Sequence, residues 1–563
     1  MSTNSFRAIV IGGGPVGIVA AHALHHAGID FVVLEQRNNI FEDVGASLIV
    51  SPHNLRVFHQ LGLWKHLEEI GAPLLHHSQG FDQRKHKFKR SYALSLLQEN
   101  HGSSLVAFHR AHLIKVLYDN LPDAAKSRYL PGKKLVDIVI TSTGTDVTCT
   151  DGSVYSGSIV IGADGAYSKT RSIMRRCALQ VDPSLASTWD PESPFTSTYK
   201  CLWASFRRPS EPGDSYETQG QDRSIMYLTG RDKGWIFLYE KLGQPSNDRP
   251  FYDEKTLRSF GESFAHWPLN EKLAVKDVLE DPSAIVGMTD LEEGIAKNFS
   301  WNGRIVLVGD SWHKFTPNSG LGFNNGVQDV VSLCNRLQAL IRVEAKPDAA
   351  ALQTAFDEYY AERHEPLEAD FLRSAGATRL STWEARRDYL LGRYLSYVGL
   401  TYISPMIGVG VGSLIAGNFG DVVVIWLARR NKGMWHSEYR QWLNIIMAVL
   451  LPGSLLLWGL GAEHGIHWVG LVFAMGLIGY FGADAVVATM CIRNTMGFAI
   501  GYGITPWTEN LGYQNAFLIA AAAGLLQVLI FLIMVKWGPQ IRERSTDRYR
   551  RDEDRATGLG ITH

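Results

Sequence analysis

The hydrophobic pattern of the first 35 residues predicts a strand, a tight turn, a helix and a second strand. An apolar run rich in β-branched residues, Phe6 to Ile11, meets a glycine-rich segment, and a helical pattern follows through Leu24. A second apolar run, Phe31 to Leu34, ends at the acid Glu35. This order of elements is typical of the βαβ unit that binds dinucleotides.

Three glycines in this unit have the spacing Gly-x-Gly-x-x-Gly. Gly12 allows a tight turn, Gly14 lets the backbone approach a pyrophosphate, and Gly17 lets the helix pack on the strand. The N-terminus of the helix then faces the phosphates, and Glu35 lies at the expected distance along the chain to accept hydrogen bonds from a ribose. A purely structural glycine turn is the alternative, which the two flanking strands and the acid disfavour.

A second buried strand, residues 158–162, is followed by Asp164-Gly165 and then by a helix. Because an Asp-Gly pair after a strand is a common turn, this motif alone favours a turn over a binding site.

A third buried strand, residues 304–308, ends in Gly309-Asp310. A loop with Pro317, Gly320 and Gly322 leads from it into a helix. A carboxylate at a strand end beside a glycine-rich helix start suits a ribityl hydroxyl, and the free backbone N–H groups suit a ring oxygen or a phosphate.

The segment between the second and third motifs predicts a sheet. Residues 196–239 alternate between apolar and polar positions and are dense in aromatic side chains, so we expect an antiparallel sheet. One face of it can line a pocket for an apolar substrate, although each ring can equally be core.

Arg110 opens a predicted helix at the end where the helix dipole is positive, which suggests an anionic partner. The basic, histidine-rich residues 76–89 fit no metal motif and are expected to form a solvated face.

The composition excludes several classes of protein. With 563 residues the chain can hold several domains, and its net charge of −1 gives no indication of nucleic-acid binding. Its five cysteines are scattered and lack CxxC spacing, so we expect reduced thiols and neither disulfides nor a metal site. The first strand starts within a few residues of the N-terminus, which leaves no room for a signal peptide.

Charged residues become rare after residue 394. The sequence there contains uncharged stretches near the roughly 20-residue length that spans a bilayer, at residues 394–420, 442–461, 466–483 and 515–535. A basic polar tail, 541–563, follows. A buried, soluble helix bundle is the alternative for this region.

Taken together, the three glycine-acid motifs resemble those of single-component flavoprotein monooxygenases of the para-hydroxybenzoate hydroxylase class. The most similar group is that of the fungal paxilline-type epoxidases, and the resemblance covers residues 5–375. It implies that the chain binds FAD, takes electrons from NADPH and reacts with O2. Glu35 would then hold the adenosine ribose, Asp310 would bind the ribityl chain, and Asp164 would serve both FAD and the nicotinamide donor.

The resemblance implies further roles for single residues. Other positions would contact the cofactor, namely Gly45, Ala46, Arg110, Gly322 and Phe323. The family often has Tyr-Arg where this chain has Tyr199-Lys200. We therefore predict Tyr199, Lys200 and Tyr227 as catalytic residues.

The end of the chain resembles a different family. Residues 398–545 are similar to a fragment of fungal major-facilitator transporters, including a cytosolic loop and the last helices. Because the first part of such a transporter is absent, the resemblance does not predict transport.

The sequence therefore predicts an α/β, Rossmann-type FAD-binding domain, residues 1–375, with an inserted mixed or antiparallel sheet near 180–295. A linker helix, 376–393, and an all-α transmembrane region, 394–540, would follow. The expected function is NADPH- and O2-dependent hydroxylation or epoxidation of a lipophilic polyketide, terpenoid or prenylated aromatic in secondary metabolism. The protein would be a multi-pass membrane protein, with its flavin domain facing the cytosol at the endoplasmic reticulum. The alternatives are an FAD-dependent oxidase or dehydrogenase on the same fold and a non-catalytic membrane fusion with a transporter remnant.

Overall fold

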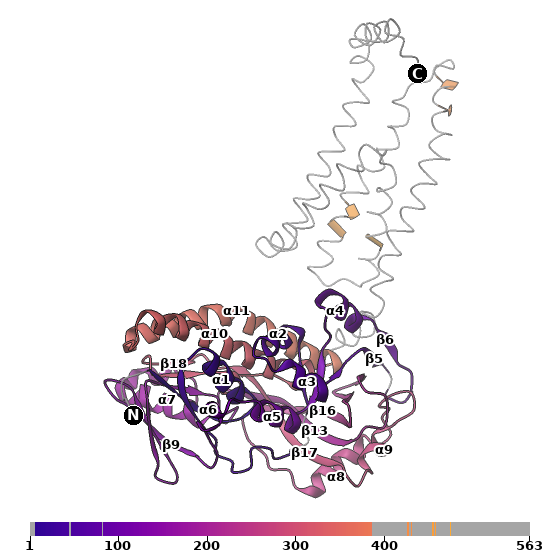
Figure 1. The fold of residues 1–563 in the computed structure, drawn as a ribbon. Coiled ribbons are helices and arrows are strands. Elements are labelled where there is room, and N and C mark those ends of the chain that lie inside the picture. The colour runs from indigo at the N-terminus through magenta and orange to yellow at the C-terminus, as the bar shows by residue number, and fades with distance from the viewer. Residues whose placement is uncertain are drawn as a thin grey trace, which may run out of the picture. The chain divides into compact units, whose positions relative to one another are not determined.

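The computed structural model describes residues 6–43, 47–81 and 83–384, together with residues 425–426, 429–430, 453–454, 456–457 and 473–474. The chain divides into two compact units, Met1–Arg393 and Tyr394–His563. Most of the described residues belong to the first unit and form the α/β fold labelled in Figure 1.

A six-stranded sheet with the order β18-β19-β12-β1-β2-β8 supports one half of this unit. All neighbours in it are parallel except β18, which is antiparallel to β19 at the edge. The strands are β1 (Arg7–Ile11), β2 (Asp30–Leu34), β8 (Tyr129–Leu130), β12 (Ile159–Gly162), β18 (Ser300–Trp301) and β19 (Ile305–Leu307). The apolar runs predicted as buried strands are β1, β12 and β19, and their central residues are completely buried. This confirms the predicted α/β architecture.

Helices pack against this sheet. Helix α1 contacts β2, α5 and α10, and α10 lies beside α11 (Figure 1). The longer helices are α1 (Pro15–His26), α5 (Arg110–Asp119), α7 (Lys169–Val181), α10 (Leu321–Val343) and α11 (Ala349–Ser381). The shorter ones are α2 (Pro52–Gln60), α3 (Trp64–Ile70), α4 (Ala93–His101), α6 (Asp123–Lys126), α8 (Glu254–Ser263), α9 (Val275–Leu279) and the 3-10 turns η1 (Pro183–Ser187), η2 (Gly309–Ser311) and η3 (Pro317–Ser319).

An eight-stranded, mostly antiparallel sheet forms the other half, with the order β20-β17-β13-β16-β15-β14-β5-β6. Its strands are β5 (His76–Gly80), β6 (Lys89–Ser91), β13 (Thr196–Arg207), β14 (Asp214–Gly220), β15 (Arg223–Thr229), β16 (Lys233–Ser246), β17 (Ile285–Ile295) and β20 (His313–Lys314). The sheet extends beyond the predicted range of 180–295 because β5 and β6 come from the polar stretch expected to be only a solvated face. Backbone pairing of β5 with β14, and not apolar alternation, holds these residues in the sheet.

Two small sheets complete the unit. One has the order β3-β7-β4 and the other β11-β10-β9. Their strands are β3 (Ser47–Val50), β4 (Ala72–Pro73), β7 (Val106–His109), β9 (Leu135–Ile140), β10 (Thr145–Cys149) and β11 (Val154–Gly157).

The large sheet buries apolar side chains on both of its faces. On β13, Leu202, Ala204 and Phe206 belong to the cluster under α8 and α9, which Figure 1 shows together at one end of the unit. Cys201 lies in a different cluster, which contacts β7. Because successive strand residues point to opposite faces, a shift of one residue decides which layer a side chain joins.

The first unit extends beyond the domain boundary predicted from the sequence at residue 375. Helix α11 continues without a break past residue 375, the predicted end of the first domain, to Ser381. The residues after it still pack on the large sheet, since Trp383 Nε1 donates to Gln219 Oε1 at 3.0 Å. The predicted transmembrane stretches and the tail lie almost entirely outside the described residues. Among those that are described, no helix has both the length and the apolar content of a membrane span.

Candidate active site

A cavity of about 880 Å³ opens where the carboxyl ends of the parallel strands meet the large sheet. Ligands of open α/β sheets bind in the crevice at this end of the strands. Most of the predicted cofactor-binding residues line the cavity, namely Gly12, Gly14, Glu35, Arg110, Asp164, Asp310, Gly322 and Phe323. The three motifs, far apart in sequence, therefore meet around one space.

The glycine turn after β1 has the geometry that its spacing predicts. Gly12 has φ +99°, and a Cβ there would lie 2.5 Å from the carbonyl oxygen of Ala163. Gly17 does not line the cavity, because it lies against the turn, where a Cβ would come within 1.9 Å of the Gly12 oxygen. A Cβ on Gly14 would meet no protein atom within 4 Å. The turn is thus closed on the protein side and open at Gly14 on the cavity side.

Glu35 lines the cavity beside the glycine turn. Its Oε2 accepts from the backbone N–H of Gly13 at 2.6 Å, and its Oε1 accepts from the N–H of Arg37 at 2.8 Å. Tyr129 supports the same turn by donating to the Gly13 oxygen at 2.6 Å, and burial raises the pKa of its hydroxyl. The carboxylate is therefore fixed beside the α1 N-terminus, where a ribose and pyrophosphate can be bound together.

Asp164 has its carboxylate turned toward the start of α7. It accepts from Ser168 Oγ at 2.6 Å, and from the N–H and hydroxyl of Thr170 at 2.9 and 3.0 Å. Burial raises the pKa of Asp164 despite these hydrogen bonds. Asp164 therefore shapes the loop that lines the cavity, and its carboxylate already has protein partners.

Asp310 lies near the start of α10 and is paired with Lys314. Although its burial opposes ionisation, the charges of Lys314 and Arg110 keep the pKa of Asp310 below its ordinary value. Burial in turn lowers the pKa of Arg110. An ionised carboxylate between two cations can accept hydrogen bonds from sugar hydroxyls.

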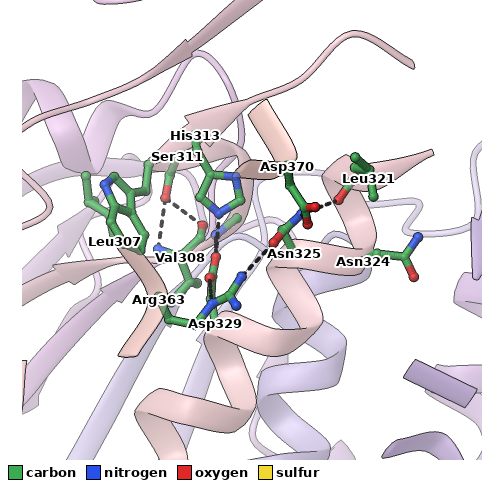
Figure 2. Close-up of polar contacts among 12 residues, drawn as sticks. Leu307, Val308, Ser311, His313, Leu321, Asn324, Asn325, Asp329, Arg363 and Asp370 are labelled. Atoms are coloured by element: carbon green, nitrogen blue, oxygen red, sulfur yellow. Dashed lines mark hydrogen bonds and ion pairs between the residues drawn. The ribbon is translucent and has the colours of Figure 1, made fainter. Parts of the chain in front are cut away.

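Figure 2 shows a buried polar network that includes His313, Asp329, Arg363 and Asn325. Asp329 accepts from His313 Nε2 at 2.6 Å and from the N–H of Gly309 at 2.9 Å, while Arg363 Nε donates to its other oxygen at 2.9 Å. Arg363 also donates to Asn325 Oδ1 at 2.6 Å. These groups tie η2, α10 and α11 together, so the loop that carries Asp310 is held by fully buried hydrogen bonds.

The start of α10 forms another part of the wall. Gly320 ends η3 with φ +63° and precedes the helix, and Gly322 and Phe323 line the cavity. The Phe323 ring is stacked on Phe58 at 6.3 Å between centroids and is buried. The N–H groups of the first helical turn are thus directed at the cavity, in a position suited to an electron-rich ring oxygen.

The opposite wall comes from one face of the large sheet and is mostly apolar. Its apolar side chains are Cys201, Trp203, Met226, Leu228, Phe237 and Leu291, and β17 also adds Asp290 and Glu292 to the lining. Most cations that line the cavity belong to other segments, namely Arg37, Arg110, Lys133, Lys134 and Lys169, whereas Lys314 lies on the edge strand β20 of the sheet. Within the described residues, the only cation that this sheet contributes to the cavity is therefore Lys314, which is paired with Asp310.

Comparison with known proteins identifies the family. The family described as FAD binding domain matches residues 5–178 and 257–369. The FAD-dependent monooxygenase ausM of Penicillium brasilianum is 32% identical over 403 residues, which are 70% of this chain and 82% of that protein. The chain belongs to the FAD-dependent monooxygenases. It is also 45% identical over 201 residues to the FAD-dependent monooxygenase SAT1 of Stachybotrys chartarum, covering 35% of this chain and 67% of that protein.

Several solved structures have the same fold as this chain. HpxO of Klebsiella pneumoniae in complex with FAD and uric acid has a TM-score of 0.54 at 23% identity, covering 69% of this chain and 92% of that one. 2,6-Dihydroxypyridine-3-hydroxylase from Arthrobacter nicotinovorans has a TM-score of 0.52 at 18% identity, with coverages of 68% and 94%. At such identities the likeness concerns the fold alone.

The cavity of the monooxygenase fits FAD. Its lining includes a glycine turn that a side chain would obstruct, the carboxylates of Glu35 and Asp310, and the starts of α1 and α10. Glu35 would hold the adenosine ribose, the turn at Gly14 the pyrophosphate, and Asp310 the ribityl chain. Gly45 and Ala46 lie outside the described residues, so their predicted contact with the cofactor stays a prediction.

The predicted catalytic residues of the monooxygenase do not line the cavity. Lys200 and Tyr227 have their side chains on the other face of the large sheet, where Lys200 pairs with Glu240 at 2.8 Å and Tyr227 contacts Ser210 at 2.6 Å. Tyr199 is buried and bonded to Thr382. Burial raises the pKa of both tyrosines to about 12, so neither is poised to exchange a proton. None of the three lines the cavity, and their catalytic role stays a prediction.

Several residues of the site have no clear sequence signal. Tyr129 lies in a two-residue strand with no motif around it. His313 and Asp329 follow the Gly309-Asp310 motif at fixed distances, but only the fold shows that they meet. Their proximity depends on the packing of α10 against η2, which the hydrophobic pattern does not specify.

Proposed function

We propose that this monooxygenase uses NADPH and O2 to hydroxylate or epoxidise a lipophilic small molecule, of the polyketide, terpenoid or prenylated aromatic class. The observation that carries the proposal is the apolar sheet wall facing the FAD-binding loops across one cavity. An apolar wall of this kind favours a lipophilic ligand over a charged one. FAD, when bound, supplies the exchange of electrons with the nicotinamide donor and the activation of O2.

The protein's own residues have three tasks in this proposal. Glu35, the glycine turn and Asp310 hold the cofactor along the strand ends. The start of α10 orients the ring end toward the large sheet. Trp203, Phe237 and their neighbours orient the substrate and exclude water, which protects the reactive oxygen from being released as peroxide.

Anaerobic reduction of the bound flavin tests the electron donor. We expect NADPH to bleach the flavin absorbance, and admission of O2 to restore it. A lipophilic substrate should then increase oxygen consumption and receive one atom from ¹⁸O₂. An absence of label in the product, with oxygen consumed, would exclude the proposed reaction.

We also propose that residues 394–540 anchor the enzyme in the endoplasmic reticulum membrane with the flavin unit on the cytosolic side. The support is the sequence pattern of uncharged stretches, together with a substrate that partitions into lipid. Resistance to carbonate extraction, combined with protease digestion of the flavin unit in sealed microsomes, would be expected. Release of the full chain by carbonate would contradict the anchor.

A further inference from the structure

The carboxylates that line the cavity differ in whether they accept hydrogen bonds from other groups of the protein. Glu35 accepts from two backbone N–H groups, Asp164 from Ser168 and Thr170, and Asp310 from Lys314. Asp290 accepts from the Tyr252 hydroxyl at 2.6 Å. Glu292 also lines the cavity, but no hydrogen bond to its carboxyl occurs within the described residues.

Glu292 is nevertheless almost completely buried. Its side chain is 8% exposed, and the nearest cation is Arg249, whose Nε lies 3.8 Å away, beyond hydrogen-bond distance. Burial raises the pKa of Glu292, although Arg249, Lys314 and Arg171 act in the opposite direction. A buried carboxyl without a donor costs free energy, and such a group in a cavity wall is satisfied when a ligand supplies the donor.

The position of Glu292 indicates which ligand this is. The carboxylates suited to FAD follow the parallel strands, whereas Glu292 belongs to β17 of the large sheet, next to Leu291 of the apolar wall. The adjacent Glu293 is bonded instead to Thr198 at 2.9 Å and Arg379 at 3.0 Å. Glu292 is thus part of the sheet that faces the cofactor loops.

We propose that Glu292 accepts a hydrogen bond from a hydroxyl or N–H group of the substrate and so selects lipophilic molecules that carry such a donor. This inference rests on the proposed function, because it assumes that the apolar wall binds the substrate. A substrate without a donor leaves the carboxyl unsatisfied, and one with a carboxylate is repelled by Glu292 and Asp290. A hydrogen bond to a charged group corresponds to about a 10- to 100-fold preference in binding.

Paired probes test this selectivity on the FAD-loaded, full-length enzyme. Each pair differs only in the donor, as in 2-naphthol with 2-methoxynaphthalene and farnesol with farnesyl methyl ether. Binding is measured from the change that each probe causes in the visible absorption of FAD. We expect the wild type to bind the alcohol at least tenfold more tightly than the ether in one pair or both.

Variants assign the preference to one side chain. Glu292→Ala should bind alcohol and ether alike, whereas Glu292→Gln, which keeps an acceptor oxygen, should retain part of the preference. Glu293→Gln is the matched control, because it removes a charge from the same strand outside the cavity wall, and it should behave as the wild type. Unchanged FAD absorption in each variant shows that the cofactor site is intact.

The outcomes separate this inference from the function on which it rests. Equal binding of alcohol and ether by the wild type, or a preference that survives in Glu292→Ala, would overturn the role of Glu292 and leave the lipophilic site standing. If no probe binds to the FAD-loaded wild type, the lipophilic substrate site fails and the inference fails with it.

Discussion

At the scale of single residues, the carboxylates of Glu35 and Asp310 in the cavity wall are the groups that the fit to FAD most directly involves. Glu35 is held by backbone donors and Asp310 by two cations, so each side chain is fixed before a ligand arrives. Pre-organisation of this kind reduces the free-energy cost of ordering side chains on binding.

We therefore expect Glu35→Gln and Asp310→Asn each to weaken FAD binding by about 10- to 100-fold, because each replaces a charge-assisted hydrogen bond by a neutral one. The dissociation constant can be measured from flavin fluorescence on titration of the apoenzyme. Glu344→Gln, on the exposed end of α10, is the control and should bind as the wild type does. FAD affinity unchanged in both variants would show that the cofactor lies elsewhere.

Asp329 makes stability depend on pH in a defined direction. Burial opposes its ionisation, but His313 and Arg363 lower the pKa of Asp329 below its ordinary value. A carboxylate with a lowered pKa in the folded state stabilises the protein above about pH 4, the value in unfolded chains, and this contribution is lost as the pH falls through the folded pKa.

Asp329→Asn should accordingly lower the free energy of unfolding by about 3–5 kcal/mol at pH 7, because it leaves Arg363 buried without a counter-charge. The variant should also lose part of the stability change that the wild type shows on acidification. Urea unfolding between pH 3 and 7 measures both effects. Asp232→Asn, at an exposed position, should change neither, and an acid response in Asp329→Asn equal to that of the wild type would contradict the assignment.

Residues inside a motif could be predicted, whereas residues that act across elements could not. Gly12, Glu35 and Asp310 have neighbours in the chain that reveal their roles. Tyr129 and Glu292 contribute through the fold alone, since the first reaches the glycine turn from β8 and the second reaches the cavity from β17. Contacts between residues that are far apart in the chain leave no pattern in the local sequence.

At the scale of elements, the glycines of the turn between β1 and α1 have two different roles: one allows close packing and the other leaves room for a ligand. A Cβ on Gly17 would collide with the Gly12 oxygen, whereas a Cβ on Gly14 would meet only the cavity. Two neighbouring glycines of one motif thus serve different purposes, which a sequence motif alone does not distinguish.

Substitution of Gly17 by alanine should affect the stability of the apoenzyme, whereas substitution of Gly14 should affect the binding of FAD. Gly17→Ala should destabilise the apoenzyme by about 1–3 kcal/mol, because α1 must move away from the turn. Gly14→Ala should unfold at the wild-type temperature without FAD and bind FAD more weakly. Thermal unfolding with and without the cofactor distinguishes the two variants. Loss of apoenzyme stability in Gly14→Ala would argue that this glycine is structural.

The large sheet shows why the sequence alone could not place the predicted catalytic residues relative to the cavity. Alternation along β13 and β15 was evident, but the pattern does not specify which face meets the cofactor. Both faces are buried, so both sets of positions are apolar and aromatic. Lys200 and Tyr227 fall on the face under α8 and α9, one residue away from the cavity side.

Variants of the two faces should therefore differ in catalysis. Met226→Ala and Phe237→Ala, on the cavity wall, should raise the KM for substrate and release more peroxide per NADPH oxidised, because water enters the enlarged site. Tyr227→Phe should retain the wild-type ratio of product to NADPH and lose only about 1 kcal/mol of stability with its hydroxyl contact. A defect in product formation in Tyr227→Phe that exceeds those of the wall variants would restore its predicted catalytic role.

At the scale of the whole molecule, the cofactor site joins segments that are widely separated along the chain. The cavity takes walls from β1, α5, the loop after β12, the large sheet and the start of α10. A ligand that contacts all of them binds the folded unit and not the unfolded chain, so binding stabilises the fold by mass action. With FAD at 100 times its dissociation constant the added stability is about 2.7 kcal/mol.

This linkage predicts that FAD raises the unfolding temperature of the flavin unit as a whole and protects it from proteolysis throughout residues 6–384, not only near the glycine turn. Asp310→Asn should reduce the shift at a fixed FAD concentration in proportion to its loss of affinity, while its apoenzyme stays close to the wild type. Differential scanning fluorimetry over a range of FAD concentrations measures the shift, and mass spectrometry of limited digests locates the protection. If protection were confined to β1, α1 and β2, the three motifs would not share one ligand. Because the cavity takes one wall from the six-stranded sheet's loops and the other from the large sheet, both halves of the unit should respond together.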